Sequence, residues 1–204
     1  MAYLGTQPND VKKNTGLYTP SEILQLTKDG SWGGSLELIE EQTVSAVSTV
    51  DFTDLKTYDV HYLSFNLTNA STDNTVNSRL SNNGGSSFIA TGYKRAFNRG
   101  SVSGNFFDAK STSDTSINMG LPIGNSANDS GNGYIYFYNL LNSSKYSFAT
   151  FHTFSRQNTL AGSTSPRFTF GGGVLATAQT HNAFQVLAGT ITEGTIKCYG
   201  VKQI

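Results

Sequence analysis

The chain has 204 residues, of which 37% are hydrophobic, a size that suits one β-sandwich with its own core and is marginal for two domains. Only 14% of the residues are charged, the formal net charge is zero, and no run of Lys and Arg indicates a nucleic-acid partner. Gly, Ser, Thr and Asn are abundant, whereas residues that favour helices are scarce. The composition therefore predicts an all-β protein with many turns.

The single cysteine, Cys198, excludes an internal disulfide, so we expect the chain to fold in a reducing cytosol. Residues 1–5 are not a basic segment followed by an apolar stretch, and no apolar run approaches the length that crosses a bilayer. We therefore expect neither a secretion signal nor membrane insertion.

Residues 1–20 carry few apolar side chains and predict an extended N-terminal arm. Thr19 is a suitable N-cap, Pro20 suits the first helical position, and Glu22 follows in the first turn, where the helix dipole favours an anion. The sequence thus predicts one short helix over residues 20–28. Its apolar side is formed by Ile23, Leu24 and Leu26.

Strand patterns begin shortly after this helix. Apolar and polar residues alternate most clearly from Tyr58 to Leu67. Turns rich in Gly, Asn and Thr separate the strands at intervals of about ten residues, which is typical of sandwiches and jelly rolls. We therefore predict a single antiparallel, jelly-roll-like β-sandwich. The expected strands cover residues 36–40, 43–52, 58–67, 76–81, 86–95, 134–138, 146–155, 167–177, 183–187 and 194–201.

Two connections stand out between these strands. Asn82–Gly85 predicts a hairpin turn, because Asn and Gly accept positive φ, and it is expected to join the strands on either side. Residues 98–133 are rich in Gly, Ser, Asn and Asp and predict a long polar loop, with a short strand near 115–121.

No motif indicates chemistry. The three histidines match no metal-ligand spacing, although His61 and His152 lie on predicted strands that can face one sheet. The glycines at 171–173 lack the Lys and Ser or Thr of a phosphate loop, and the carboxylate pairs show no catalytic arrangement. We expect no enzymatic activity, no cofactor, and no catalytic or metal-binding residue.

The aromatic content is the unusual feature of this sequence. Tyr134, Tyr136 and Tyr138 share one face of a predicted strand, with Phe137 opposite. A row of Tyr side chains can stack on sugar rings. The same row can fill a sandwich core or a subunit contact, and the sequence leaves these alternatives open.

Two stretches resemble proteins of tailed-phage particles. Residues 16–34, which include Tyr18 and Trp32, are similar to a linker that precedes a β-rich domain in many tail-fibre and virion surface proteins. Residues 189–201 are similar to the closing strand of phage β-sandwich proteins, especially those of marine phages. Cys198 here replaces a more usual apolar residue.

The resemblance implies a structural virion protein, often trimeric, assembled in the host bacterial cytoplasm. It leaves open whether this is a head-decoration (cement) protein or a tail-fibre component. Residues 1–34 would attach it to capsid or tail proteins, and residues 35–204 would form the displayed sandwich. The expected attachment contacts are Tyr18, Ile23, Leu24, Leu26 and Trp32.

A second hypothesis is a host-receptor or glycan-binding module of a tail fibre. It would use Tyr134, Tyr136 and Tyr138 or the segment 98–133, with a host surface glycan as partner. A polysaccharide depolymerase is the third hypothesis. Those enzymes usually form long β-helices with repeated rungs, and the sequence shows no such repeat.

Overall fold

The computed structural model describes residues 19–28, 35–69, 74–102, 104–125, 128–158 and 164–202. The chain divides into two units, residues 1–35 and 36–204. Apart from Thr19 and Pro20, the predicted N-terminal arm lies outside the described residues.

The described part of the first unit is the helix α1, Pro20–Lys28, which confirms the predicted range. Thr19 and Glu22 form a reciprocal cap. The Glu22 N–H donates to Thr19 Oγ1 at 3.3 Å, and the Thr19 N–H donates to Glu22 Oε2 at 2.7 Å. The hydrogen bonds from Thr19 lower the pKa of the Glu22 carboxyl below its usual value.

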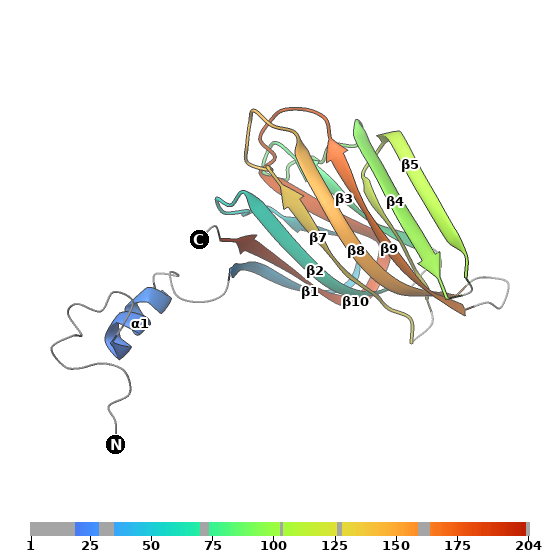
Figure 1. Cartoon of the computed structure of the whole chain (residues 1–204), viewed down its shortest axis with the longest axis horizontal. Helices are drawn as coiled ribbons and strands as arrows, with labels where there is room; N and C mark the ends of the chain where they lie inside the picture. The colour runs from blue at the N-terminus through green and yellow to red at the C-terminus, as the bar shows by residue number, and fades with distance from the viewer. Residues whose placement is uncertain are drawn as a thin grey trace, which may run out of the picture. The chain divides into compact units, whose positions relative to one another are not determined.

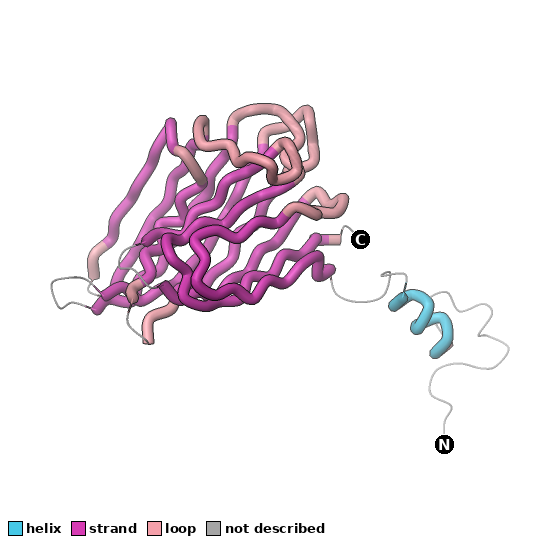
Figure 2. Tube along the Cα trace, turned by 180° about the vertical axis from the view of Figure 1, so that it is seen from behind, coloured by secondary structure: helices cyan, strands magenta, loops and turns pink. Residues whose placement is uncertain are grey.

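The second unit consists of antiparallel strands, so the predicted all-β, sandwich-like fold with one short helix is confirmed for the described residues (Figure 1). The loops gather at the ends of the strands (Figure 2). The strands are β1 Leu36–Phe52, β2 Val60–Asn69, β3 Asn74–Ser81, β4 Tyr93–Ser101, β5 Phe106–Asp114, β6 Ile117–Ile123, β7 Gly131–Tyr138, β8 Ser147–Asn158, β9 Thr164–Leu175 and β10 Ala183–Val201.

Strand pairing follows one continuous order, β5-β4-β9-β8-β7-β2-β10-β3-β6, with β1 also beside β10. The path divides at β10, because its residues 183–187 pair with β3 whereas residues 191–200 pair with β2. The smaller sheet therefore contains β3, β6 and the first part of β10. The larger sheet contains the second part of β10 with β2, β7, β8, β9, β4 and β5.

The strands β1 and β10 bend together as they pass from one sheet to the other. Ala46 in β1 and Gly189 in β10 have positive φ, +55° and +54°, and the register shifts between Val47 and Thr49. The sequence predicted two strands in each of these regions. Each pair is one long strand, because a bend at a single positive-φ residue does not end the pairing.

The core lies between the two sheets and is filled by inward-pointing side chains, which alternate with outward ones along most of the strands. The strand β6 packs directly on the larger sheet, since Thr169 Oγ1 donates to the Gly120 carbonyl at 3.0 Å and Ser155 Oγ donates to the Pro122 carbonyl at 2.6 Å. The largest fully buried side chains are Tyr93, Phe52, Phe137, Phe184, Leu63, Leu67, Leu80, Ile117, Met119, Leu121, Ile123 and Ile135.

The prediction of a long polar loop over residues 98–133 is wrong. This segment contains the end of β4, all of β5 and β6, and the start of β7. As an edge strand, β5 has a mostly polar composition without breaking the sheet. The short strand expected near 115–121 corresponds to β6, which is buried on both faces over most of its length and therefore shows no alternation.

The predicted hairpin is also wrong, although its turn is present. Gly84 and Gly85 have φ of +71° and +87°, as a turn of this composition requires. However, the next strand, β4, begins only at Tyr93 and pairs with β5 and β9, not with β3. The Leu80 N–H donates to the Tyr93 hydroxyl at 2.7 Å. The turn thus opens a crossover between the two sheets.

Candidate functional site

The outer face of the larger sheet carries most of the exposed aromatic side chains of the described residues. In β7, Ile135 and Phe137 point into the core, so the alternation directs Tyr134, Tyr136 and Tyr138 outward. The expected common face of these three tyrosines is therefore present. Of the alternatives that the sequence left open, filling the core of this sandwich is excluded.

Strand register sets the side chains of neighbouring strands in rows across this outer face. Tyr136 lies opposite Tyr62 on β2 and Thr150 on β8, and Tyr134 lies opposite His152 on β8. The first row runs Lys110, Ala96, Gly172, Thr150, Tyr136, Tyr62, Tyr199. The second runs Asp108, Asn98, Phe170, His152, Tyr134, Ser64, Lys197.

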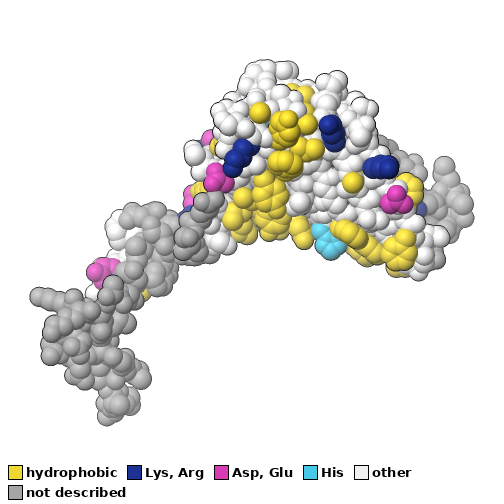
Figure 3. Space-filling view, turned by 45° about the horizontal axis from the view of Figure 1, so that its top comes forward, with side chains coloured by type: hydrophobic (Ala, Val, Ile, Leu, Met, Phe, Trp, Pro, Cys, Tyr) yellow, Lys and Arg dark blue, Asp and Glu magenta, His cyan; other side chains and the backbone are white. Residues whose placement is uncertain are grey.

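The rings on this face touch in an unbroken series from β10 to β5, which we call the aromatic band. Neighbouring ring centroids lie between 4.8 Å, for Tyr62 and Tyr136, and 6.5 Å, for His152 and Phe170. Figure 3 shows hydrophobic side chains gathered along one face of the sandwich with a histidine among them. The members of the band are Tyr199, Tyr62, Tyr138, Tyr136, Tyr134, His152, Phe170, Phe168 and Phe106.

Tyr62 is the centre of the tyrosine part of the band. Its ring contacts those of Tyr134, Tyr136 and Tyr199. Partial burial, followed by the proximity of these three phenols, raises the pKa of Tyr62 above its usual value. The Tyr62 hydroxyl therefore stays protonated at physiological pH. The cluster offers ring faces together with hydrogen-bonding hydroxyl groups.

The outer face is hollowed along part of the band and next to it. Two adjoining hollows of about 460 and about 440 Å³ meet at Thr150. The floor is formed by Ala96, Gly172 and Thr150, which follow one another in the first row and have little or no side chain. The walls are Phe148 and Val174 on one side and His152 and Phe170 on the other. We call this feature the trough.

Charge around the trough is one-sided. Lys94 and Lys110 line it, and no Asp or Glu does so among the described residues. Arg95 also lines it, but its guanidinium is paired with Asp114. Neither lysine has a carboxylate partner in the described part of the chain. Asp108 lies on the same face one row away from Lys110, outside the lining.

The sequence did not single out the residues that make the trough. Residues 146–155 were predicted as a strand, and Phe148, Thr150 and His152 share its exposed face. What was missing was the pairing of β4 with β9, because pairing between strands that are distant in sequence leaves no mark in a single sequence. Gly172, one of the three glycines at 171–173, lies at the trough floor in the paired strand β9.

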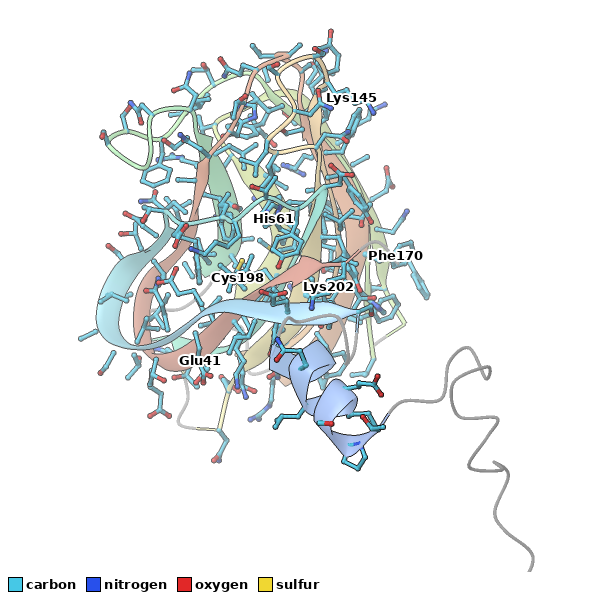
Figure 4. All side chains as sticks on the ribbon, turned by 90° about the vertical axis from the view of Figure 1, so that its left-hand side faces the viewer. Glu41, His61, Lys145, Phe170, Cys198 and Lys202 are labelled. Atoms are coloured by element: carbon cyan, nitrogen blue, oxygen red, sulfur yellow. The ribbon has the colours of Figure 1, made fainter. Side chains whose placement is uncertain are left out.

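Two histidines, His61 and His181, and the single cysteine, Cys198, are buried. His61 lies in the core, not on the face of His152; its Nε2 donates to the Leu55 carbonyl at 2.7 Å, and burial lowers its pKa. Burial lowers the pKa of His181 to about 4 and raises that of the Cys198 thiol to about 12. Figure 4 shows His61 and Cys198 between the sheets and Phe170 projecting outward. Among the described residues, no three His, Cys, Asp or Glu side chains gather as a metal site would require.

The predicted attachment residues are only partly described. Ile23 is half-buried and Leu24 is 54% exposed on α1, while Leu26 belongs to the helix. Tyr18 and Trp32 lie outside the described residues. Their expected contact with capsid or tail proteins stays a prediction.

The chain matches no protein-family model, no curated protein and no solved structure. Within the described residues, α1 is too short and too polar to cross a membrane.

Proposed function

We propose that this chain is a non-enzymatic structural component of a tailed-phage particle, which displays its sandwich on the virion surface. The proposal draws on the resemblance of residues 16–34 and 189–201 to phage virion proteins. The observation that carries it is the aromatic band, an extended set of outward rings on a sheet face. Contiguous exposed apolar surface of this kind marks an interaction site.

The test is to locate the protein on particles. Antibodies raised against residues 36–204 are applied to purified intact particles and followed by electron microscopy. We expect labelling at a defined position, on the head or on the tail. Recovery of the protein only from the infected-cell lysate, with none in washed particles, would contradict the proposal.

Attachment is assigned to residues 1–34, which precede the first strand of the sandwich. A chain that begins at residue 35 retains all ten strands and is expected to fold with the same β-rich circular dichroism spectrum. It should fail to join particles that lack the full-length protein. Normal occupancy of the truncated chain would place the attachment surface on the sandwich instead.

Homotrimerisation is proposed from the resemblance. Light scattering at micromolar concentration should give three times the mass of one chain, which is 21.9 kDa. A monomer both in solution and on the particle lattice would contradict this part of the proposal.

A second candidate function is recognition of a host surface glycan. The trough favours it, because exposed aromatic faces beside hydroxyl groups suit the apolar faces and hydroxyls of sugar rings.

A further inference from the structure

The second candidate function can be narrowed to one class of ligand. We propose that the trough binds an acidic polysaccharide, with sugar rings against Phe148 and Phe170 and anionic groups at Lys94 and Lys110. This inference rests on the glycan-recognition function proposed above, and its first support is the shape of the face.

The trough has the length that a linear ligand requires. Lys110 and Tyr136 lie on the first and the last of five neighbouring strands along the first row, four strand spacings apart, which corresponds to about 19 Å at the usual spacing. Over the middle of this distance the floor residues are Ala96, Gly172 and Thr150, so nothing large rises from it. A chain of sugars can lie along the row.

The walls offer ring faces that are still accessible. Phe148 is 44% exposed and Phe170 is 48% exposed, and they face the floor from opposite sides. Stacking against such rings removes apolar C–H surface of a sugar from water without a need for close shape complementarity. The Thr150 hydroxyl, hydrogen-bonded to the Tyr138 hydroxyl at 3.1 Å, supplies a polar pair on the floor.

The charge pattern selects the kind of sugar. Lys94 and Lys110 are exposed, line the trough and have no carboxylate partner in the described part of the chain. Two unpaired ammonium groups beside a lining without Asp or Glu attract an anion and disfavour a cation. A neutral glycan would offer no anionic partner to Lys94 and Lys110, so carboxylated or sulfated sugars fit the trough best.

The same features argue against a second copy of this chain in the trough. Lysine is depleted from the centre of protein–protein interfaces, because burial of an unpaired ammonium is costly. A self-interface that joins two troughs would cover Lys94 and Lys110 with the trough lining of another copy, which carries the same lysines and no Asp or Glu. The acidic polysaccharide is therefore the occupant that the observations favour.

The experiment measures binding of the full-length chain by affinity gel electrophoresis and calorimetry. The probes are polygalacturonate, which carries carboxylates, dextran sulfate, which carries sulfates, neutral dextran, and poly-glutamate, which is anionic without sugar rings. We expect binding to at least one of the acidic polysaccharides, weakened by salt, and no binding to dextran or poly-glutamate. Equal binding of poly-glutamate or of neutral dextran would overturn the inference, as would no binding to either acidic polysaccharide.

Variants then assign the site. Phe148→Ala, Phe170→Ala and the double substitution Lys94→Gln, Lys110→Gln should each weaken binding at least tenfold, and Ala96→Trp should block the floor. Matched controls outside the trough are Phe154→Ala and Lys56→Gln, which should change affinity less than twofold.

Light scattering on the same variants distinguishes a trough that binds polysaccharide from a trough that contacts a second copy of the chain. An unchanged oligomeric mass is expected for every trough variant. A change in mass with Ala96→Trp would mean that the trough is a subunit contact and would overturn the inference. The two proposals can fail separately. If the chain does not bind acidic polysaccharide but antibodies still label the particles, the glycan site is refuted and the virion assignment stands.

Discussion

Phe184 is the residue on which the two-sheet architecture can be tested most sharply. It lies in the first part of β10, fully buried, with its ring 4.9 Å from that of Phe52 in β1 and 4.9 Å from that of Phe137 in β7. Phe52 is its neighbour within the smaller sheet, whereas Phe137 belongs to the larger sheet. The ring therefore bridges the two layers.

The substitution Phe184→Ala removes a buried ring and leaves a cavity between the sheets. Such changes cost about 3–5 kcal/mol in the free energy of unfolding, and the two ring contacts favour a value of about 4 kcal/mol. With a denaturant slope of about 2 kcal/mol per molar, the urea midpoint should fall by about 2 M. The domain stays folded only if the total stability exceeds this loss.

The assay is urea unfolding of the full-length chain, followed by near-ultraviolet circular dichroism, at a protein concentration where the oligomeric state is the same for all variants. The matched control is Phe154→Ala, whose ring is 52% exposed, and its effect should stay within about 0.5 kcal/mol. A loss below about 1.5 kcal/mol for Phe184→Ala with an unchanged slope would mean that the ring does not fill the space between two sheets.

Three further predictions follow from single residues. Because burial raises the Cys198 thiol pKa to about 12, a thiol reagent at pH 8 should leave the native chain unmodified and react fully in urea; fast reaction of the native chain would contradict burial of β10. The pKa of His181 is lowered from 6.5 to about 4, so the unfolded chain binds the proton more readily, and stability should fall as the pH drops from about 6.5 to about 4. The variant His181→Gln should have a shallower stability profile over that pH range, and an identical profile would refute the assignment. Gly189→Ala should cost about 1–2 kcal/mol in urea unfolding, because its φ of +54° strains an L side chain; a neutral effect would contradict the bend at this residue.

The sequence was sufficient for the fold class and for the helix. The cap formed by Thr19 and Glu22 involves residues only three positions apart, so a single sequence is enough to predict it. Strand alternation likewise placed Tyr134, Tyr136 and Tyr138 on one face. These predictions needed only neighbours within a few residues of one another.

What the sequence could not provide depends on pairing between distant segments. The polar β5 is a strand because β4 supplies its partner. The strand β6 forms because it pairs with β3 and packs on the larger sheet. The turn at Asn82–Gly85 has hairpin chemistry but leads into a crossover. The trough could not be predicted for the same reason, since its floor requires β4 to pair with β9, and four strands lie between these two in the sequence.

The trough on the outer face of the larger sheet is the proposed binding surface of this protein. Hydroxyl-radical footprinting of the full-length chain, read by mass spectrometry with and without saturating acidic polysaccharide, tests it most directly. We predict rapid oxidation of Phe148 and Phe170 and protection of Phe137 and Phe184 in the free chain. With the polysaccharide bound, Phe148 and Phe170 should become protected while Phe154 stays reactive. Protection of Phe148 and Phe170 already in the free chain, or no change on binding, would contradict the claim.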